Sequence, residues 1–228
     1  MSEQKWLPGT LLGRLDETSR KALLALGVPK TVAAGSPIIR EGHRETFVVL
    51  LIDAVAKVTA AMADGRPALL SIRMSGDIVG EMSALNEVPR SATVTACRPS
   101  AVRVIYRDEF REYMRTRADA AVEIAGTVAD RLRWANRRRM DFAAYPVKVR
   151  LARVLAEMSA AYGRRGADGI VVSVDLTQAE LATLCGAASM SVQKALRELR
   201  QANLVETGYR RIVVRDLAVL RELADAAV

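Results

Sequence analysis

Hydrophobic and polar positions follow two patterns in the first half of this chain of 228 residues. Apolar residues recur at helical spacing from Leu11 to Leu26, with Asp16 and Thr18 as candidate N-caps. From Thr31 to Tyr106 the pattern changes to short β-branched runs separated by turn residues, and Asp64-Gly65 favours a tight hairpin. Evenly spaced short strands of this kind predict a small antiparallel barrel or jelly roll.

A long helical stretch follows, from Asp108 to about Phe142. Small and apolar residues repeat in it at alternating spacings of four and three, which is the pattern of a coiled-coil seam. The predicted seam consists of Ala121, Ala125, Val128, Leu132 and Ala135. We expect two copies of the chain to pair along this seam, because the arginines around it leave no other continuous apolar face. The alternative is a helix that packs only on its own barrel.

Pro146 marks the next boundary, because the residue before a proline tends to leave helical geometry. We expect a hinge at 142–146, followed by an amphipathic helix over Val147–Tyr162, a loop at 163–169 and a strand over Ile170–Val174. The predicted domains are 1–107, 108–145 and 146–228.

The last of these domains carries two short amphipathic helices. Thr177 and Glu180 have the spacing of a capping box at the start of the first helix, and Gly186 supplies the turn. A second helix is predicted over Ala188–Gln201, and residues 204–214 have the pattern of a β-hairpin wing. Together these elements predict a helix-turn-helix, and the whole chain is expected to have an α+β fold.

Composition restricts the function further. The net charge of +8 and the isoelectric point near 9.9 suit a polyanionic partner such as nucleic acid or an anionic surface. Cys97 and Cys185 lack metal-ligand spacing and are expected to be buried reduced thiols, and His43 is the only histidine. This composition argues against a His-ligated metal centre, a catalytic triad or a haem held by two histidines. No apolar run approaches the roughly 18–20 residues of a membrane helix, and residues 1–6 show no signal peptide, so we expect a cytoplasmic protein without a membrane partner.

Two short strings carry the candidate binding chemistry. Gly80-Glu81 and Pro89-Arg90-Ser91-Ala92 lie on either side of a predicted short helix. The planar fork of Arg90 suits a phosphate, and the carboxylate of Glu81 can accept a hydrogen bond from a ribose hydroxyl. Backbone N–H groups around Gly80 and Ala84 can complete an anion-binding nest. These residues therefore predict a site for a small phosphorylated sugar.

The same strings resemble the phosphate-binding cassette of cyclic-nucleotide-binding domains, and the strands with the Glu41-Gly42 turn resemble the β-roll of that family. Asp53-Ala54 departs from the family pattern, which usually has a glycine there. With the pairing helix and the winged helix-turn-helix in the same order, the chain resembles the cyclic-AMP receptor and fumarate-nitrate-regulator (Crp/Fnr) superfamily over nearly its whole length. This resemblance implies that Glu81 binds the ribose 2′-hydroxyl and Arg90 the phosphate. The implied nucleotide site comprises Gly80, Glu81, Met82, Arg90, Ser91, Ala92 and Asn136.

The resemblance also places the nucleotide base against the long helix. Receptor members of the family carry a threonine–serine pair where this chain has Ala135-Asn136, and the Asn136 amide can replace the lost hydrogen bond. Ser91 occurs in the family with either cyclic AMP or cyclic GMP, so the residues leave that choice open. Cyclic AMP is our expected effector.

On the second helix of the helix-turn-helix, the outward positions predict an interface with double-stranded DNA. Gln193 suits an adenine edge, and Lys194 suits a guanine or a phosphate. Receptor members carry arginine, glutamate and a later arginine at the positions of Ser189, Met190 and Lys194, so we expect a different half-site. The predicted DNA contacts are Thr177, Gln178, Ser189, Met190, Ser191, Gln193, Lys194, Arg197, Arg210 and Arg211, of which Thr177, Gln178, Arg210 and Arg211 are expected to bind phosphates.

The sequence therefore predicts a homodimeric transcription regulator that binds a palindromic operator under the control of a cyclic nucleotide. RNA polymerase is a candidate further partner. We expect no metal, haem or iron-sulfur cluster, because the family's cysteine cluster is absent, and no enzyme, because no nucleophile–base pair is evident. Two alternatives stay open. In the first, the cassette is vestigial or binds another anion instead of a cyclic nucleotide. In the second, the C-terminal domain binds protein instead of DNA.

Overall fold

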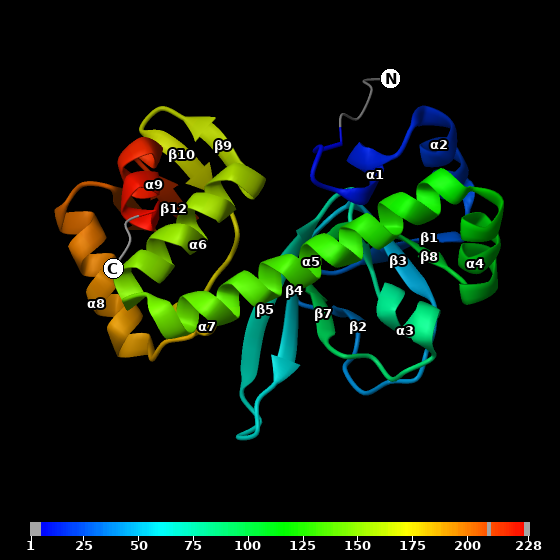
Figure 1. The fold of residues 1–228 in the computed structure, drawn as a ribbon, viewed down its shortest axis with the longest axis horizontal. Coiled ribbons are helices and arrows are strands. Elements are labelled where there is room, and N and C mark those ends of the chain that lie inside the picture. Colours follow the sequence, from blue (N-terminus) through cyan, green and yellow to red (C-terminus); the bar gives the residue numbers. More distant parts are fainter. Residues whose placement is uncertain (1–5, 209–210, 226–228) are drawn as a thin grey trace. The chain divides into compact units, whose positions relative to one another are not determined.

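The computed structural model describes residues 6–208 and 211–225 (Figure 1). The chain forms two compact units, Met1–Leu132 and Arg133–Val228. The boundary between them falls inside helix α5, Ala118–Ala144, so the last turns of this helix belong to the C-terminal unit. Within the described ranges, none of the helices has the length and hydropathy needed to cross a bilayer.

The predicted N-terminal helix is two helices, α1 (Leu11–Arg14) and α2 (Glu17–Ala25). Leu15 is extended, and the Asp16 side chain then accepts a hydrogen bond from a backbone N–H in the first turn of α2. Asp16 is therefore confirmed as an N-cap. Thr18 is not a cap, because it lies inside α2.

Eight strands build the β-roll of the N-terminal unit, in two antiparallel four-stranded sheets with the orders β1-β8-β3-β6 and β2-β7-β4-β5 (Figure 1). The strands are β1 Val28–Val32, β2 Pro37–Ile39, β3 Val48–Asp53, β4 Val55–Ala61, β5 Pro67–Met74, β6 Ile78–Val79, β7 Thr93–Ala96 and β8 Ser100–Ile105. Strand β3 is buried on both faces. Val48 and Leu50 pack with the helices, whereas Val49 and Leu51 pack between the sheets. The predicted β-roll is confirmed.

Two turns of the β-roll bear on the sequence predictions. Gly65 has φ +80° in the β4–β5 hairpin, and the Met62 N–H donates to the Arg66 carbonyl at 2.9 Å, so the predicted Asp64-Gly65 turn is confirmed. Ala54 is fully buried, and its N–H donates to the Ser75 hydroxyl oxygen at 2.9 Å. Ala54 does not have a positive φ, so this turn does not require the glycine that the family usually has.

The long helix predicted from Asp108 is also interrupted. Helix α4, Arg107–Thr116, ends before Arg117, whose φ of −133° and ψ of 83° are not helical, and α5 begins at Ala118. The Thr116 hydroxyl donates back to the carbonyls of Glu112 and Tyr113, which competes with continuation of the helix.

Helix α5 presents two neighbouring faces in the N-terminal unit. Ala120, Ile124 and Thr127 are buried, and the first two belong to the core of that unit. The expectation that α5 has no other apolar face than the seam is therefore wrong. The predicted seam lies one residue further round the helix, where Leu132 is 61% exposed, Ala125 and Ala135 are exposed and Ala121 and Val128 are half-buried.

The C-terminal unit continues with α6 Val147–Tyr162, β9 Gly163–Gly166, β10 Gly169–Val172, α7 Gln178–Leu184, α8 Ser189–Gln201, β11 Val205–Gly208, β12 Arg211–Val214 and α9 Leu217–Asp225. Its sheet has the order β11-β12-β10-β9. The stretch 163–169 is a hairpin and not the predicted loop, because Gly163–Gly166 pairs antiparallel with β10. The wing strands β11 and β12 pair as predicted, with Val205 opposite Val214.

Candidate nucleotide and nucleic-acid sites

The cassette is organised by Gly80, the N-cap residue of α3 (Glu81–Asn86). Gly80 has φ +83°, which a side chain rarely tolerates. A Cβ atom at this position would lie 2.6 Å from Arg90 Nη1 and 2.9 Å from Ile39 Cδ1. Glycine is therefore required here both by the backbone conformation and by the close approach of Arg90.

Arg90 is 3% exposed, and its guanidinium is bonded inside the protein. Nη1 donates to the Gly80 carbonyl at 2.8 Å, and Nη2 donates to the Phe47 carbonyl at 2.6 Å. The guanidinium also lies over the Phe47 ring, 4.7 Å from its centre. Burial lowers the pKa of Arg90, while the charges of Glu45 and Glu81 raise it. Nε is buried without a hydrogen-bond partner among the described residues. Since a guanidinium carries five N–H donors and the two carbonyls use two of them, Arg90 keeps unused donors.

Glu81 is also buried, and it has a cationic partner that the sequence did not reveal. Arg131 Nη1 lies 2.9 Å from Glu81 Oε1, and Arg131 Nη2 donates to the Ile78 carbonyl at 2.7 Å and lies 3.7 Å from Asp77. Arg131 continues the buried face of α5 at helical spacing from Ala120, Ile124 and Thr127. That spacing was the available signal. Arg131 thus fixes one carboxylate oxygen of Glu81 and leaves the other as an acceptor.

The remaining predicted cassette residues are more exposed. Met82 is 47% exposed, Ala92 is half-buried, and the exposed Ser91 has its hydroxyl 3.7 Å from Met82 Sδ. The structure thus brings Gly80, Glu81, Met82, Arg90, Ser91 and Ala92 together around α3. Asn136 is exposed on the part of α5 that belongs to the C-terminal unit.

The helix-turn-helix has the local features that the sequence predicted. Thr177 Oγ1 accepts from the Glu180 N–H at 3.1 Å, and Glu180 Oε2 accepts from the Thr177 N–H at 2.8 Å, which confirms the capping box. Gly186 has φ +57°, and its carbonyl accepts from Arg150 Nη1 at 3.0 Å. A Cβ atom on Gly186 would lie 2.6 Å from the Phe142 ring, so the turn also requires glycine.

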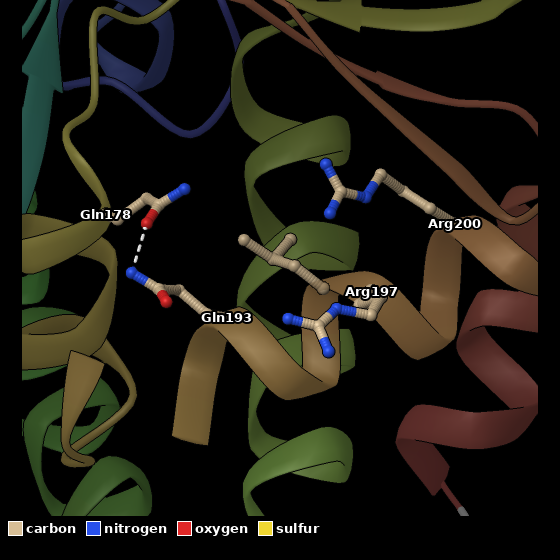
Figure 2. Close-up of a pocket in the computed structure, with 5 residues that line it drawn as sticks. Gln178, Gln193, Arg197 and Arg200 are labelled. Carbon is tan, nitrogen blue, oxygen red and sulfur yellow. Dashed lines mark hydrogen bonds between the residues drawn. The ribbon is translucent and has the colours of Figure 1, made fainter. Parts of the chain in front are cut away.

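The outward side of this motif forms the recognition surface, which we define as the exposed residues Thr177, Gln178, Met190, Ser191, Gln193, Lys194, Arg197, Arg200 and Arg211. Ser189 is half-buried, and Arg210 lies outside the described residues. Figure 2 shows Gln178 and Gln193 pointing toward each other, with Gln193 Nε2 donating to Gln178 Oε1 at 2.7 Å. Arg200, which the sequence analysis missed, follows Arg197 at i+3 and donates to the Thr207 hydroxyl on the wing at 3.0 Å.

The last turns of α5 are bound to α6 inside the C-terminal unit. Trp134 Nε1 and Arg138 Nη2 both donate to Glu157 Oε2, at 2.9 and 2.7 Å. Trp134 is therefore a partner of α6 within the C-terminal unit. Arg138 is 6% exposed, whereas its neighbours Arg137 and Arg139 are exposed.

The cysteines are reduced and differ in burial. Cys185 is fully buried, and burial raises the pKa of its thiol to about 12, whereas Cys97 is only half-buried. Across 6–208 and 211–225, no group of three or more His, Cys, Asp or Glu residues has the arrangement of a metal site.

Comparison with known proteins identifies two domain families in the chain. The cyclic nucleotide-binding domain family matches residues 29–117, and the Crp-like helix-turn-helix domain family matches residues 149–223. The chain belongs to the Crp/Fnr superfamily, which consists of transcription regulators and not of enzymes. It is a DNA-binding transcription regulator with a cyclic nucleotide-binding domain.

One relative and two solved structures of similar fold are examples of these matches. The CRP-like cAMP-activated global transcriptional regulator of Mycobacterium tuberculosis is 26% identical over 215 residues, which cover 89% of this chain and 96% of the relative. The structure of FixK2 from Bradyrhizobium japonicum has a TM-score of 0.75 at 20% identity and covers 89% of this chain and 100% of its own. The c-di-GMP responsive regulator CLP of Xanthomonas campestris has a TM-score of 0.73 at 19% identity, with coverage of 88% and 100%.

Proposed function

We propose that this protein is a homodimeric regulator whose affinity for a palindromic operator is controlled by cyclic AMP bound at the cassette. The observation that carries the proposal is the pair of buried opposite charges, Glu81 at the first residue of α3 and Arg90 in the segment that follows this helix. A carboxylate acceptor and a guanidinium donor match the ribose hydroxyl and the cyclic phosphate of one nucleotide. The cAMP-activated relative in Mycobacterium tuberculosis supports the choice of nucleotide.

The contacts of Arg90 favour this assignment. Two of its nitrogens are bonded to the Phe47 and Gly80 carbonyls, which hold the guanidinium in one orientation. Its unpartnered Nε gains a hydrogen bond when a phosphate oxygen arrives, and a charged acceptor forms a stronger bond than a carbonyl. Arg131 similarly orients Glu81, whose second oxygen remains for the ribose.

The homodimer is supported by the predicted seam. Leu132 is 61% exposed, and the alanines at 125 and 135 are exposed small residues that allow two helices to approach closely. The base of the nucleotide is expected beside this seam, at Asn136. A two-fold dimer presents two recognition surfaces, so its operator is expected to be a palindrome. RNA polymerase stays a candidate partner.

In the proposed mechanism, the nucleotide binds one setting of the paired helices more tightly than the other, because only a difference in affinity can shift an equilibrium. Helix α5 carries that change toward the C-terminal unit, and the bonds of Trp134 and Arg138 to Glu157 join its last turns to α6. We propose that the predicted hinge at 142–146, beside the predicted domain boundary at 145/146, then reorients the helix-turn-helix. A coupling of about 1–3 kcal/mol is typical of such switches.

Calorimetric titration of the full-length protein with cyclic AMP and cyclic GMP, with and without a pool of DNA fragments, tests the proposal. We expect heat of binding with cyclic AMP, none in Arg90→Ala, and tighter binding when DNA is present. If the DNA affinity of Arg90→Ala still responded to the nucleotide, the effector site would not be the cassette. A monomer at micromolar concentration, measured by light scattering, would contradict the dimer.

A regulator with a different effector is the second candidate. It is favoured by the internal partners of Glu81 and Arg90, which satisfy both charges without a nucleotide, and the c-di-GMP response of CLP shows that effectors differ within this fold. The same titration separates the two candidates, because this regulator would bind DNA but neither cyclic nucleotide. A C-terminal unit that binds protein would lack the steep loss of affinity with salt that phosphate contacts cause.

A further inference from the structure

Gln178 and Gln193 are brought together across the helix-turn-helix, from the first residue of α7 and the second turn of α8 (Figure 2). Both side chains are exposed, and Gln193 Nε2 donates to Gln178 Oε1 at 2.7 Å. They lie at one end of an open pocket whose other lining residues are Leu196, Arg197 and Arg200. The pocket thus lies within the recognition surface, with the amide pair and the two arginines from α8 on its wall.

The hydrogen bond between the two amides limits what Gln193 can offer to a base. A glutamine amide has two N–H donors and one carbonyl oxygen. One N–H of Gln193 is committed to Gln178, so one N–H and the oxygen remain. In the major groove adenine presents one acceptor, N7, beside one donor, the N6 amino group, whereas guanine presents two acceptors, N7 and O6. The remaining groups of Gln193 therefore match adenine and not guanine.

Without Gln178 this selectivity would be weaker. The terminal torsion of a glutamine is broad and nearly two-fold, so an unrestrained amide can turn and offer both N–H groups to guanine. The polarity of the pair also needs a cause, because either amide can act as the donor. A phosphate that accepts from Gln178 Nε2 supplies it, since the Gln178 oxygen must then face Gln193. The predicted phosphate contact of Gln178 is thus the step that fixes Gln193.

We propose that Gln178 is the positioning residue for Gln193, and that the DNA backbone, Gln178, Gln193 and an adenine form one chain of hydrogen bonds. The inference rests on the proposed DNA-binding function and deepens it, because it assigns one base of the half-site. Gln178 contacts no base itself. Its effect on base choice passes through the orientation of Gln193.

Selection of the full-length protein against a random double-stranded DNA pool, with and without cyclic AMP, tests this inference. Gln193→Ala identifies the base that residue 193 contacts, because preference disappears there and at its symmetry mate. In the wild type we expect adenine at that position, preferred over guanine by about tenfold, the order of one bidentate contact. Gln178→Ala should reduce that preference to about twofold or less while the other positions of the motif keep theirs.

Two matched variants separate positioning from simple phosphate binding. Gln178→Glu keeps an acceptor for Gln193 but repels phosphate, so adenine stays preferred while affinity falls on all sequences. Gln178→Lys keeps a phosphate donor but can only donate to the Gln193 oxygen, which leaves both N–H groups for the base and shifts the preference to guanine. Residue 178 is exposed, so the unfolding midpoint should not change in any of the three variants.

The outcomes distinguish this inference from the function on which it rests. An unchanged base preference in Gln178→Ala and Gln178→Lys, or a base other than adenine opposite Gln193, overturns the positioning role alone. A wild-type protein that enriches no sequence in either condition overturns the proposed function and this inference with it.

Discussion

Arg90 in the N-terminal unit is 3% exposed and donates to two backbone carbonyls, whereas Arg197 in the C-terminal unit is exposed on the recognition surface. The same contrast separates Glu81, which is buried against Arg131, from Gln193, which is exposed and paired with another exposed amide. A buried charge is costly unless it is paired and hydrogen-bonded, while an exposed polar group has little effect on folding. The internal contacts of Glu81 and Arg90 therefore connect the proposed nucleotide site to the stability of the fold.

The difference also bears on which of the two sites can change. Substitutions on the recognition surface are expected to alter DNA contacts with little effect on stability, which accords with the departure of the exposed Met190 and Lys194 from the receptor pattern. Substitutions in the cassette change stability and ligand binding together. The predictions below compare matched residues from the two environments.

Arg90→Ala against Arg197→Ala is the strongest comparison. Loss of Arg90 leaves the half-buried Phe47 and Gly80 carbonyls without their donors, so the free energy of unfolding should fall by about 2–4 kcal/mol and nucleotide binding should be lost. Arg197→Ala should change the free energy of unfolding by no more than about 0.5 kcal/mol and weaken only DNA binding. Urea unfolding followed by circular dichroism measures both. Equal destabilisation by the two variants would show that burial of Arg90 does not make it more important to stability than the exposed Arg197.

Gly80→Ala against Gly65→Ala separates crowding from backbone strain. Both glycines have positive φ, +83° and +80°, so alanine is strained at each by about 1–2 kcal/mol. Only Gly80 has close neighbours, since a Cβ on Gly65 would meet nothing within 4 Å. Gly80→Ala should therefore cost a further 1–3 kcal/mol or so, the usual range for overpacking, and displace Arg90. Similar urea midpoints for the two variants would show that the Arg90 side chain moves aside for the new Cβ atom at little cost in stability.

Alkaline pH probes one buried acid in each unit. Burial raises the pKa of Tyr113 to about 12, from 10.0, and its hydroxyl donates to the Ser19 carbonyl at 2.9 Å. Below about pH 10, Tyr113 is protonated in both the folded and the unfolded protein. Between about pH 10 and 12 it ionises in the unfolded protein but stays protonated in the folded one, so the free energy of unfolding falls as the pH rises through this window. Tyr113→Phe should cost about 1 kcal/mol at neutral pH and make the N-terminal unit less sensitive to alkali.

Cys185 provides the control for that measurement, because burial raises the pKa of its thiol from 9.0 to about 12 in the C-terminal unit. The contribution of the Cys185 thiol to the free energy of unfolding is lost as the pH rises from about 9 to 12. This loss should be the same in the wild type and in Tyr113→Phe. Thermal unfolding from pH 7 to 11, with the two units followed by separate probes, makes the comparison. An unaltered alkaline response of the N-terminal unit would exclude Tyr113 as its source.

Glu198→Gln is expected to have the smallest effect. Glu198 and Lys148 lie 3.3 Å apart with side chains 38% and 41% exposed, which makes them a surface ion pair between α6 and α8. Such pairs contribute about 0–1 kcal/mol and are screened by salt, so the variant should change the free energy of unfolding by less than about 0.5 kcal/mol. A larger loss in the urea experiment, one that persists at high salt, would show that the pair is not solvent-screened.

Local signals in the sequence predicted most of the fold. The Thr177–Glu180 capping box, the Gly186 turn and the Gly65 hairpin each depend on residues a few positions apart, so the chain specifies them without knowledge of distant contacts. The break at Arg117 and the strand at 163–166 were missed in the sequence analysis, because neither feature has a signal in the neighbouring residues. Arg117 has no proline or glycine to mark it, and the strand exists because β10 pairs with it.

The candidate sites divide in the same way. Glu81 and Arg90 could be recognised because they lie close together in the sequence around one short helix. Helical spacing could have placed Arg131 on the buried face of α5, but not its pairing with Glu81, which lies 50 residues away. The proposed role of Gln178 likewise depends on a side chain 15 residues further on. The partner of Arg138, Glu157, also lies too far along the chain for a local pattern to reveal it, at a separation of 19 residues.

By itself, the sequence determined the order of the elements, their caps and turns, and the residue types that suit a nucleotide phosphate and a DNA groove, because short-range geometry and hydrogen-bonding capacity are properties of the chain. Only the tertiary structure decided which face of α5 is buried, which cation neutralises Glu81, and how the two glutamines of the recognition surface meet. The first two depend on which side chains burial forces together, because a charge removed from water needs the partner that the packing supplies. The third depends on how the fold places α7 and α8, which brings two exposed amides within hydrogen-bonding distance.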